Sequence, residues 1–327
     1  MKLRKLLTGI LASVGFGMLV LDSKTALLGA KDGVELCLQT VIPSLFPFFI
    51  ISVLFVNTIG AIHAPPLRWI CKLAGIPNGA DSLLIIGLLG GYPTGAQAVS
   101  EAYKAGRISR TNAIRMLHFC SNAGPAFLFG MVSSLLPSQK YTWCLWGIHI
   151  TSALIVSLFL AVDNSQGIAV GSYSDLTVSQ AMQQSIRSMA SVCGWVIVFR
   201  VIITYLKRWF LWRLPMELQI LVTGLMELTN GCQMLFQIEN LQNRFLFCSL
   251  MLSFGGICVI MQTDSVIGNL PLGAYLRGKI MQTLLSFLFC IGIVHRTLFF
   301  YCSAVLLILL LLRKKQKNCS NPRPVVV

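Results

Sequence analysis

The sequence contains few charged residues and very few acidic ones. Charged residues make up only 11% of the 327 positions, whereas soluble domains carry about 25%. Hydrophobic residues account for 55% of the chain, and its mean hydropathy is +0.75. This balance excludes a soluble globular domain and is typical of a polytopic membrane protein.

Signatures of catalysis and metal binding are also missing. The sequence has no H-E-x-x-H, G-x-S-x-G, paired-aspartate or Walker pattern, the motifs of zinc, nucleophilic and nucleotide chemistry. Its 11 cysteines form no C-x-x-C pair and lie mostly in apolar runs, where cysteine acts as a small buried hydrophobe. We therefore expect no enzyme, no cofactor and no metal site.

Basic residues dominate the small set of charges. Lys and Arg number 26 against 11 Asp and Glu, which gives a formal charge of +15. They sit in short clusters beside apolar segments, as in loops that orient a membrane protein, and they form no basic groove with interleaved aromatics. We expect the lipid bilayer and a small molecule as partners and no nucleic acid. The oligomeric state stays open.

The hydrophobic residues gather in runs near the length of a membrane-spanning helix. These runs cover residues 6–21, 34–56, 83–99, 113–136, 142–162, 189–206, 218–236, 245–267, 280–294 and 298–312. Residues 1–5 and 313–317 are basic, which places both termini in the cytoplasm. No small-x-small cleavage site follows the first run, so we expect an uncleaved helix rather than a signal peptide.

The most unusual stretch is GLLGGYPTGA at residues 87–96. In a helix interior glycine costs about 1 kcal/mol and proline about 3 kcal/mol relative to alanine, so Gly90, Gly91 and Pro93 must open the helix. Opened backbone is tolerated within a membrane only where it is buried in protein or lines a watered cavity. The stretch therefore predicts part of a binding site.

The flanks of residues 83–99 indicate how this segment meets the membrane. Arg68 and Lys72 precede it, and Lys104 and Arg107 follow it. A full crossing would leave one of these basic flanks outside, whereas a hairpin that enters and turns back keeps both inside. We favour the re-entrant hairpin over the crossing.

Three further breaks interrupt apolar segments, at residues 120–125 (CSNAGP), 224–231 (GLMELTNG) and 252–256 (LSFGG). The breaks at 224–231 and 252–256 correspond to those at 87–96 and 120–125, with an offset of about 130 to 140 residues. Paired interruptions in two halves point to a transporter's substrate site. If both hairpins are re-entrant, the second half begins on the opposite side of the membrane. The halves then form an inverted repeat.

Polar side chains at the four breaks are the candidate substrate-binding residues, because half-helix ends and unwound carbonyls bind ions and polar groups. They are Tyr92, Thr94, Gln97, Ser121, Asn122, Thr229, Asn230, Ser253 and Gln262. The alternative is that each of them only satisfies freed backbone groups.

Two of the ionisable residues within apolar runs are candidates for a functional role. Glu227 is a candidate for binding a coupling proton or cation, because such groups are costly in a membrane and usually functional. The alternative is that it caps the adjacent break. Arg200 is a candidate for pairing with an anionic substrate, or it reaches toward the membrane interface. His118 and His149 are expected to be hydrogen-bonded packing residues.

The motifs at these breaks resemble those of the sporulation integral membrane protein YlbJ family, which carries nucleoside-recognition (Gate) domains. They are PSLFP at 43–47, GYPTGA at 91–96, FCSNAGP at 119–125, ELTNG at 227–231 and SFGG at 253–256 with Gln262. Two features depart from the family pattern. Ser121 stands where a second Asn is common, and residues 258–261 replace a polar, His-containing stretch.

The resemblance implies a transporter with two Gate-type repeats that moves dipicolinate from the mother cell toward the forespore. It also implies a place in the bacterial cell membrane or the forespore outer membrane. A structural or assembly protein of the spore envelope and a nucleoside-type solute transporter are the alternatives. The substrate, the coupling ion and the direction of transport are not determined by the sequence.

The expected fold is an all-α polytopic membrane protein with about eight transmembrane helices and two re-entrant helical hairpins. Residues 1–24 form an N-terminal membrane helix, and residues 25–162 the first Gate-like repeat. A connector at 163–179 leads to the second repeat at 180–295. Residues 296–327 form the last membrane helix and a basic cytoplasmic tail.

Overall fold

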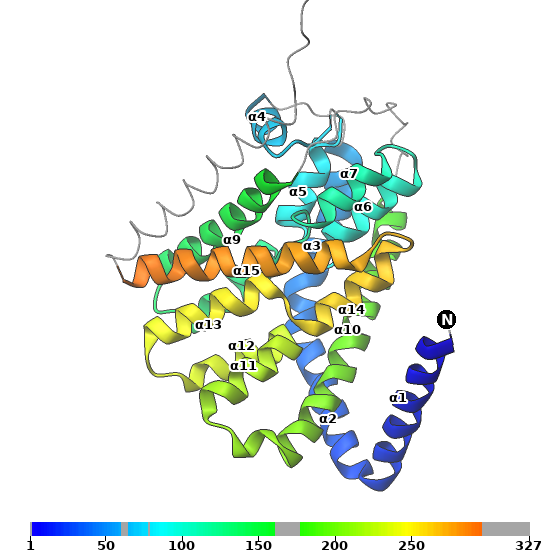
Figure 1. Cartoon of the computed structure of the whole chain (residues 1–327), viewed down its shortest axis with the longest axis vertical. Coiled ribbons are helices and arrows are strands. Elements are labelled where there is room, and N and C mark those ends of the chain that lie inside the picture. The colour runs from blue at the N-terminus through cyan, green and yellow to red at the C-terminus, as the bar shows by residue number, and fades with distance from the viewer. Residues whose placement is uncertain (1, 60–64, 78, 161–176, 296–327) are drawn as a thin grey trace, which may run out of the picture.

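The architecture of the chain is all-helical in a computed structural model that describes residues 2–59, 65–77, 79–160 and 177–295 (Figure 1). No strand occurs among these residues. The helices are α1 (Lys2–Leu21), α2 (Ser23–Leu36), α3 (Ile42–Ile59), α4 (Pro65–Leu73), α5 (Asp81–Leu89), α6 (Thr94–Lys104), α7 (Arg110–Leu117), α8 (Pro125–Gly130), α9 (Gln139–Phe159), α10 (Val178–Trp209), α11 (Met216–Met226), α12 (Leu228–Met234), α13 (Leu241–Phe254), α14 (Gly256–Ile267) and α15 (Leu272–Val294). Short π or 3-10 turns are η1 (Cys37–Val41), η2 (Val132–Leu135), η3 (Leu211–Arg213) and η4 (Leu235–Gln237).

Within the described residues, five stretches are long and apolar enough to cross a membrane. They are Ser23–Ile51, Gln139–Phe159, Val178–Trp209, Leu241–Ile267 and Leu272–Val294. The chain is therefore a polytopic helical membrane protein. The expected span at 298–312 and most of the connector at 163–179 lie outside the described residues. The full count of about eight spans stays a prediction.

The run at 113–136 is broken into shorter pieces. Helix α7 ends at Leu117, an extended segment covers residues 121–124, and α8 and η2 follow. The break expected at residues 120–125 is thus observed. Helices α7 and α8, which flank it, are each too short to span a bilayer.

The proline-rich stretch before α3 is less disrupted than the sequence suggests. Helix α3 continues through Pro47, and the irregularity is confined to the π-helical turn η1 that precedes Pro43. Ser44 Oγ donates to the carbonyl oxygens of Thr40, at 2.6 Å, and Val41, at 3.3 Å. A side-chain hydroxyl therefore adds hydrogen bonds to the backbone where the π-helical turn meets α3.

Helices α5 and α6 fold back on each other at the first break. A β-carbon on Gly95 would lie 2.8 Å from the Cα of Gly87, and one on Gly87 would lie 2.7 Å from the Cα of Cys120. Only glycine permits this approach of backbones. The segment is thus a helical hairpin, whereas its entry into and exit from one side of the membrane stay a prediction.

Helices α11 and α12 form a second hairpin of the same kind. A β-carbon on Gly231 would collide with the Cα of Gly224, and one on Gly224 would lie 2.9 Å from Cγ of Met251. The pair Gly224 and Gly231 thus plays the same part as Gly87 and Gly95. This parallel agrees with two related halves, and their inverted orientation stays a prediction.

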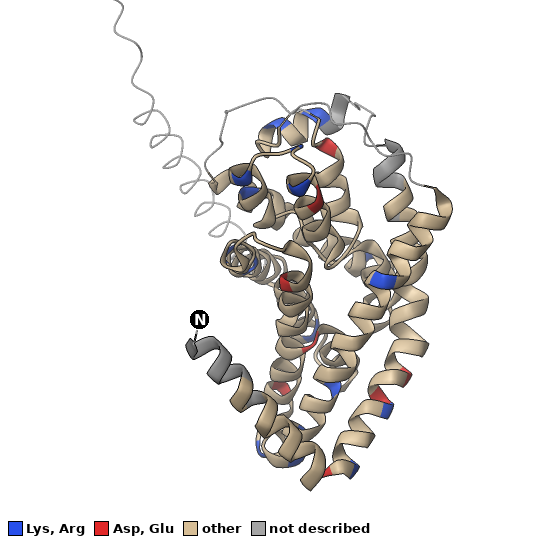
Figure 2. Cartoon of the chain, turned by 90° about the vertical axis from the view of Figure 1, so that its right-hand side faces the viewer, with Lys and Arg blue, Asp and Glu red and all other residues tan. Residues whose placement is uncertain are grey.

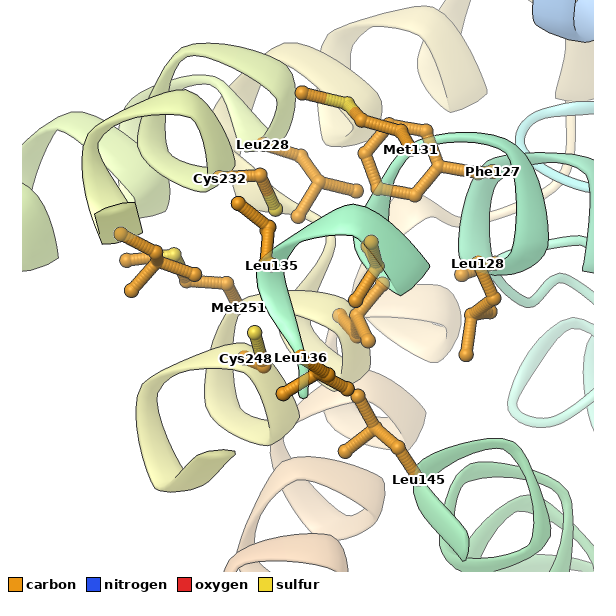
Figure 3. Packing of buried hydrophobic residues seen from close by; sticks show 14 of the residues in the cluster. Phe127, Leu128, Met131, Leu135, Leu136, Leu145, Leu228, Cys232, Cys248 and Met251 are labelled. Carbon is orange, nitrogen blue, oxygen red and sulfur yellow. The ribbon is translucent and has the colours of Figure 1, made fainter. Parts of the chain in front are cut away.

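The two halves share a hydrophobic core rather than forming one each. Figure 3 shows Leu135 and Leu136 of the first half packed beside Cys232, Cys248 and Met251 of the second half. All of these side chains are buried. The halves are therefore held in direct contact along their length.

Charges are sparse on the helices and occur toward both ends of the molecule. Figure 2 shows mostly uncharged ribbon, with several basic residues at the end where α4 to α7 lie in Figure 1. One of them, Arg115, is buried and donates to carbonyl oxygens of Ala74, Gly75 and Ser157. This side chain fixes α7 against the end of α4 and the end of α9.

Candidate functional site

The four breaks meet one another in the interior. A β-carbon on Gly124 would lie 3.0 Å from the Cα of Gly91, and one on Gly255 would lie 3.3 Å from the ring of Tyr92. A β-carbon on Gly256 would lie 3.3 Å from the carbonyl oxygen of Met226. The breaks therefore form one continuous row, in the order second, first, fourth, third.

Tyr92 joins the first hairpin to the second half of the chain. Its side chain is buried, and its hydroxyl donates to the carbonyl oxygen of Leu252 at 3.0 Å. The same oxygen accepts a hydrogen bond from Lys279 Nζ at 3.1 Å. The turn residue expected at the first break thus contacts both α13 and α15.

Lys279 is the central charged residue of this region and was not among the residues expected from the sequence. It is fully buried on α15. Its Nζ donates to Gln282 Oε1 at 2.7 Å and lies 3.4 Å from Asn122 Oδ1. It also lies 4.9 Å from the ring centroid of Tyr92 and 5.7 Å from that of Tyr275, within cation–π range.

A signal for this residue exists in the sequence. Lys279, Gln282 and Ser286 recur at i, i+3 and i+7, which places them on one face of a helix. All three are fully buried in the structure. Because Lys279 directly precedes the apolar run at 280–294, its position in the sequence is also typical of a residue that flanks a membrane span.

Amide side chains connect Lys279 to the second break. Asn122 Nδ2 donates to the carbonyl oxygens of Gly87, at 2.9 Å, and Phe119, at 2.7 Å. Gln282 Nε2 donates to Asn122 Oδ1 at 2.9 Å and to the carbonyl oxygen of His149 at 3.1 Å. Asn122 therefore both satisfies the opened backbone and belongs to a buried polar cluster.

His149 supports the unwound segment from α9. It is almost fully buried, and its Nε2 accepts a hydrogen bond from the backbone N–H of Ala123 at 3.1 Å. An accepting Nε2 means that the imidazole is neutral with its proton on Nδ1. This geometry agrees with the expected hydrogen-bonded packing role.

Glu227 forms a second polar centre at the third break. Its carboxylate caps α12, accepting from Thr229 N at 3.0 Å, Asn230 N at 2.7 Å and Asn230 Nδ2 at 2.6 Å. The capping alternative is therefore observed. A coupling role for the same carboxylate stays a prediction.

Arg200 reaches this second centre from α10. Its guanidinium donates to Asn230 Oδ1 and forms an ion pair with Asp32 Oδ2 at 3.2 Å. The acidic partner on α2 was not expected from the sequence, because it lies 168 positions away. Arg200 thus links α2, α10 and α12, and its pairing with a substrate stays untested.

The remaining candidates are divided between the row of breaks and its surroundings. Ser121 and Ser253 are buried at the breaks. Thr94 is half-buried at the start of α6. Gln97 Nε2 instead donates to Glu101 Oε1 at 2.8 Å, near the surface, and Gln262 Nε2 donates to Cys258 Sγ at 3.3 Å.

Within the described parts of the chain, no three His, Cys, Asp or Glu side chains gather to hold a metal ion. Two charged centres stand out instead: Lys279 among neutral oxygens, and Glu227 with Asn230, Arg200 and Asp32. Glu227 contacts backbone N–H groups at the third break, and Lys279 contacts the side chains of Tyr92 and Asn122 at the first two breaks.

Comparison with known proteins gives one informative match. The chain is 24% identical over 288 residues to the sporulation integral membrane protein YlbJ of Bacillus subtilis (strain 168). The alignment covers 73% of this chain and 70% of that protein. The similarity supports YlbJ-like family membership.

The expected resemblance to the YlbJ family is thus confirmed. No family model matches the YlbJ-like chain, and no solved structure matches it. The Gate-type organisation therefore stays a prediction based on the break motifs.

Proposed function

We propose that this protein is a secondary-type transporter of a small anionic metabolite that binds at the row of broken helices near the membrane midplane. By the family resemblance the metabolite is dipicolinate, moved during sporulation. The observation that carries the proposal is the meeting of four helix breaks beside a buried lysine.

The free-energy cost of the helix breaks supports a transport function. Unwound backbone and buried amides inside an apolar bundle are expensive, and transporters retain them where the opened helices form the substrate site. Two hairpins from separate halves of the chain contribute here, and Tyr92 joins the first hairpin to the second half. A site on such a seam can alternate between two sides when the halves rock against each other.

The charge of Lys279 supports an anionic substrate. Its hydrogen-bond partners are the neutral oxygens of Tyr92, Asn122 and Gln282. Glu227, in contrast, accepts hydrogen bonds from three N–H groups, and the side chain of Asn230 links it to Arg200. The row of breaks thus has one positive centre whose charge a substrate would balance.

The proposal includes the arrangement in the membrane. Both termini lie in the cytoplasm, the two hairpins are re-entrant, and about eight helices span the bacterial cell membrane or the forespore outer membrane. The protein performs no catalysis and binds no nucleic acid. Its partners are the lipid bilayer and the transported anion.

Uptake by purified protein in liposomes tests the function. We expect saturable uptake of radiolabelled dipicolinate that protein-free liposomes do not show. Metabolite profiling of cells that lack the protein should reveal the same compound displaced from its normal compartment. Absence of saturable uptake for dipicolinate and for every compound so identified would favour a structural role in the spore envelope, and uptake of nucleosides alone would favour a nucleoside-type carrier.

A further inference from the structure

We infer that Lys279 is the point at which a carboxylate group of the transported molecule binds, with Tyr92, Asn122 and Gln282 as the surrounding polar groups. This inference rests on the proposed transport function. It names the chemical group recognised and moves the anion-binding role from Arg200 to a residue on α15.

The first argument is charge balance. Lys279 is fully buried, and an isolated buried charge is costly unless an opposite charge accompanies it. The ion pairs that the structure gives for the described residues join Arg68 with Asp81, Arg200 with Asp32 and Arg208 with Asp22. Lys279 takes part in none of them, so a bound anion would supply the missing charge.

The second argument is the supply of polar groups. The ammonium has three N–H donors and now directs them at three neutral oxygens, the longest contact being 3.4 Å to Asn122 Oδ1. Ser121 Oγ, beside Asn122, and Ser286 Oγ, one turn beyond Gln282 on α15, are buried and have no hydrogen-bond partner among the described residues. These hydroxyls are available donors for a polar ligand.

The third argument favours a carboxylate over a phosphate as the group that Lys279 binds. Phosphate sites commonly use arginine forks or several cations, because the group carries more charge and more acceptor oxygens. The buried arginine of α7, the helix that precedes the second break, is Arg115, and it is engaged with backbone carbonyls of residues 74, 75 and 157. A single lysine flanked by the rings of Tyr92 and Tyr275 matches one carboxylate.

The position of the cluster gives binding a consequence for transport. Tyr92 and Asn122 belong to the first two breaks, while Lys279 and Gln282 belong to α15 in the second half. A β-carbon on Gly278 would collide with the backbone of His118 at the end of α7, and Gln282 of α15 donates to Asn122 in the second break. An anion at Lys279 would therefore contact both halves and bias their relative position.

Binding to the purified full-length protein in lipid nanodiscs tests the inference. The probes are dipicolinate, its monocarboxylate analogue picolinate and the neutral pyridine-2,6-dicarboxamide. We expect both carboxylates to bind and the diamide not to bind. Lys279→Met should weaken dipicolinate binding at least tenfold, whereas Lys279→Arg should retain part of it. Lys140→Met, which removes an exposed lysine at the start of α9, is the matched control and should bind as the native protein does.

A stability measurement separates binding from a purely structural role. Because Lys279→Met removes a buried charge, its unfolding temperature without ligand should equal or exceed that of the native protein. Its unfolding temperature should no longer rise when dipicolinate is added. If Lys279→Met fails to fold, Lys279→Gln provides the same comparison with a polar neutral side chain.

The outcomes distinguish this inference from the proposed function. Saturable dipicolinate uptake with native affinity in the folded lysine variants would overturn the role of Lys279 and leave transport standing. Displacement by chloride or phosphate but not by carboxylates would overturn the choice of carboxylate. Absence of uptake and binding in the native protein would overturn the transport proposal itself.

Discussion

The two helical hairpins use the same backbone device and differ in how they carry charge. Each hairpin closes through a pair of glycines, Gly87 with Gly95 and Gly224 with Gly231. The second hairpin contains its own carboxylate, Glu227, whereas the first contains no charged residue at its break. The charge near the first hairpin comes from Lys279 on α15.

This difference separates two tasks. Glu227 is bound by N–H groups of residues two and three positions further along the chain, so its local role is to hold the opened α12 in place. Lys279 contacts residues 157 and 187 positions away, so its position depends on the packing of both halves. Under the proposed function, the region of the first hairpin and Lys279 would respond to the substrate, and Glu227 would keep the second hairpin folded.

The largest expected effect tests whether the hairpins are equivalent. Gly95→Leu and Gly231→Leu each place a side chain where backbone already lies, so each should lower stability by about 4 kcal/mol or more and abolish folding. Thermal unfolding and gel filtration after detergent extraction measure this. Gly147→Ala, in α9 with open space beside it, is the control and should behave normally. If the protein folded with only one of the two leucine substitutions, the two hairpins would not be equivalent.

The next effect concerns the carboxylate of the second hairpin. Glu227→Gln replaces an acceptor of three hydrogen bonds with a weaker one, which should lower the free energy of unfolding by about 1 to 3 kcal/mol. Transport should be impaired while membrane insertion is retained. Exposed Glu217→Gln is the matched control. Normal substrate accumulation in Glu227→Gln would remove this carboxylate from the transport mechanism.

A smaller effect is expected for the ion pair that leads to the second hairpin. The side chains of Arg200 and Asp32 remain 20% and 37% exposed, so solvent screens their attraction. Asp32→Asn should cost about 1 kcal/mol or less. Arg200→Met should cost more, because it also leaves Asn230 Oδ1 without its donor. Equal losses in chemical denaturation would indicate that the contact with Asn230 contributes nothing.

The smallest effect is expected for an exposed ion pair, which serves as a reference for both hairpins. Arg208 pairs with Asp22 at 3.4 Å, and its side chain is 59% exposed. Arg208→Gln should change stability by about 0.5 kcal/mol at most, with any change vanishing in high salt. A loss of transport in this variant would show that charges far from the breaks matter as much as those beside them.

Several features of this protein follow from the sequence alone. Low charge and high hydropathy determine the membrane class, and the glycines and proline of residues 87–96 determine that a helix opens there. The capping role of Glu227 was also an expected alternative. These features are local, because glycine, proline and capping side chains act on backbone within a few residues.

Only the tertiary structure decided which distant residues meet. Lys279 approaches Tyr92 and Asn122, and Asp32 pairs with Arg200, because particular helices pack together across the two halves. A sequence pattern shows which face of a helix is buried, but many partners are compatible with that face. The close approach of backbones at glycines selects among them, since Gly278 lets α15 pack against the end of α7, just before the second break, and Lys279 follows it directly in the chain.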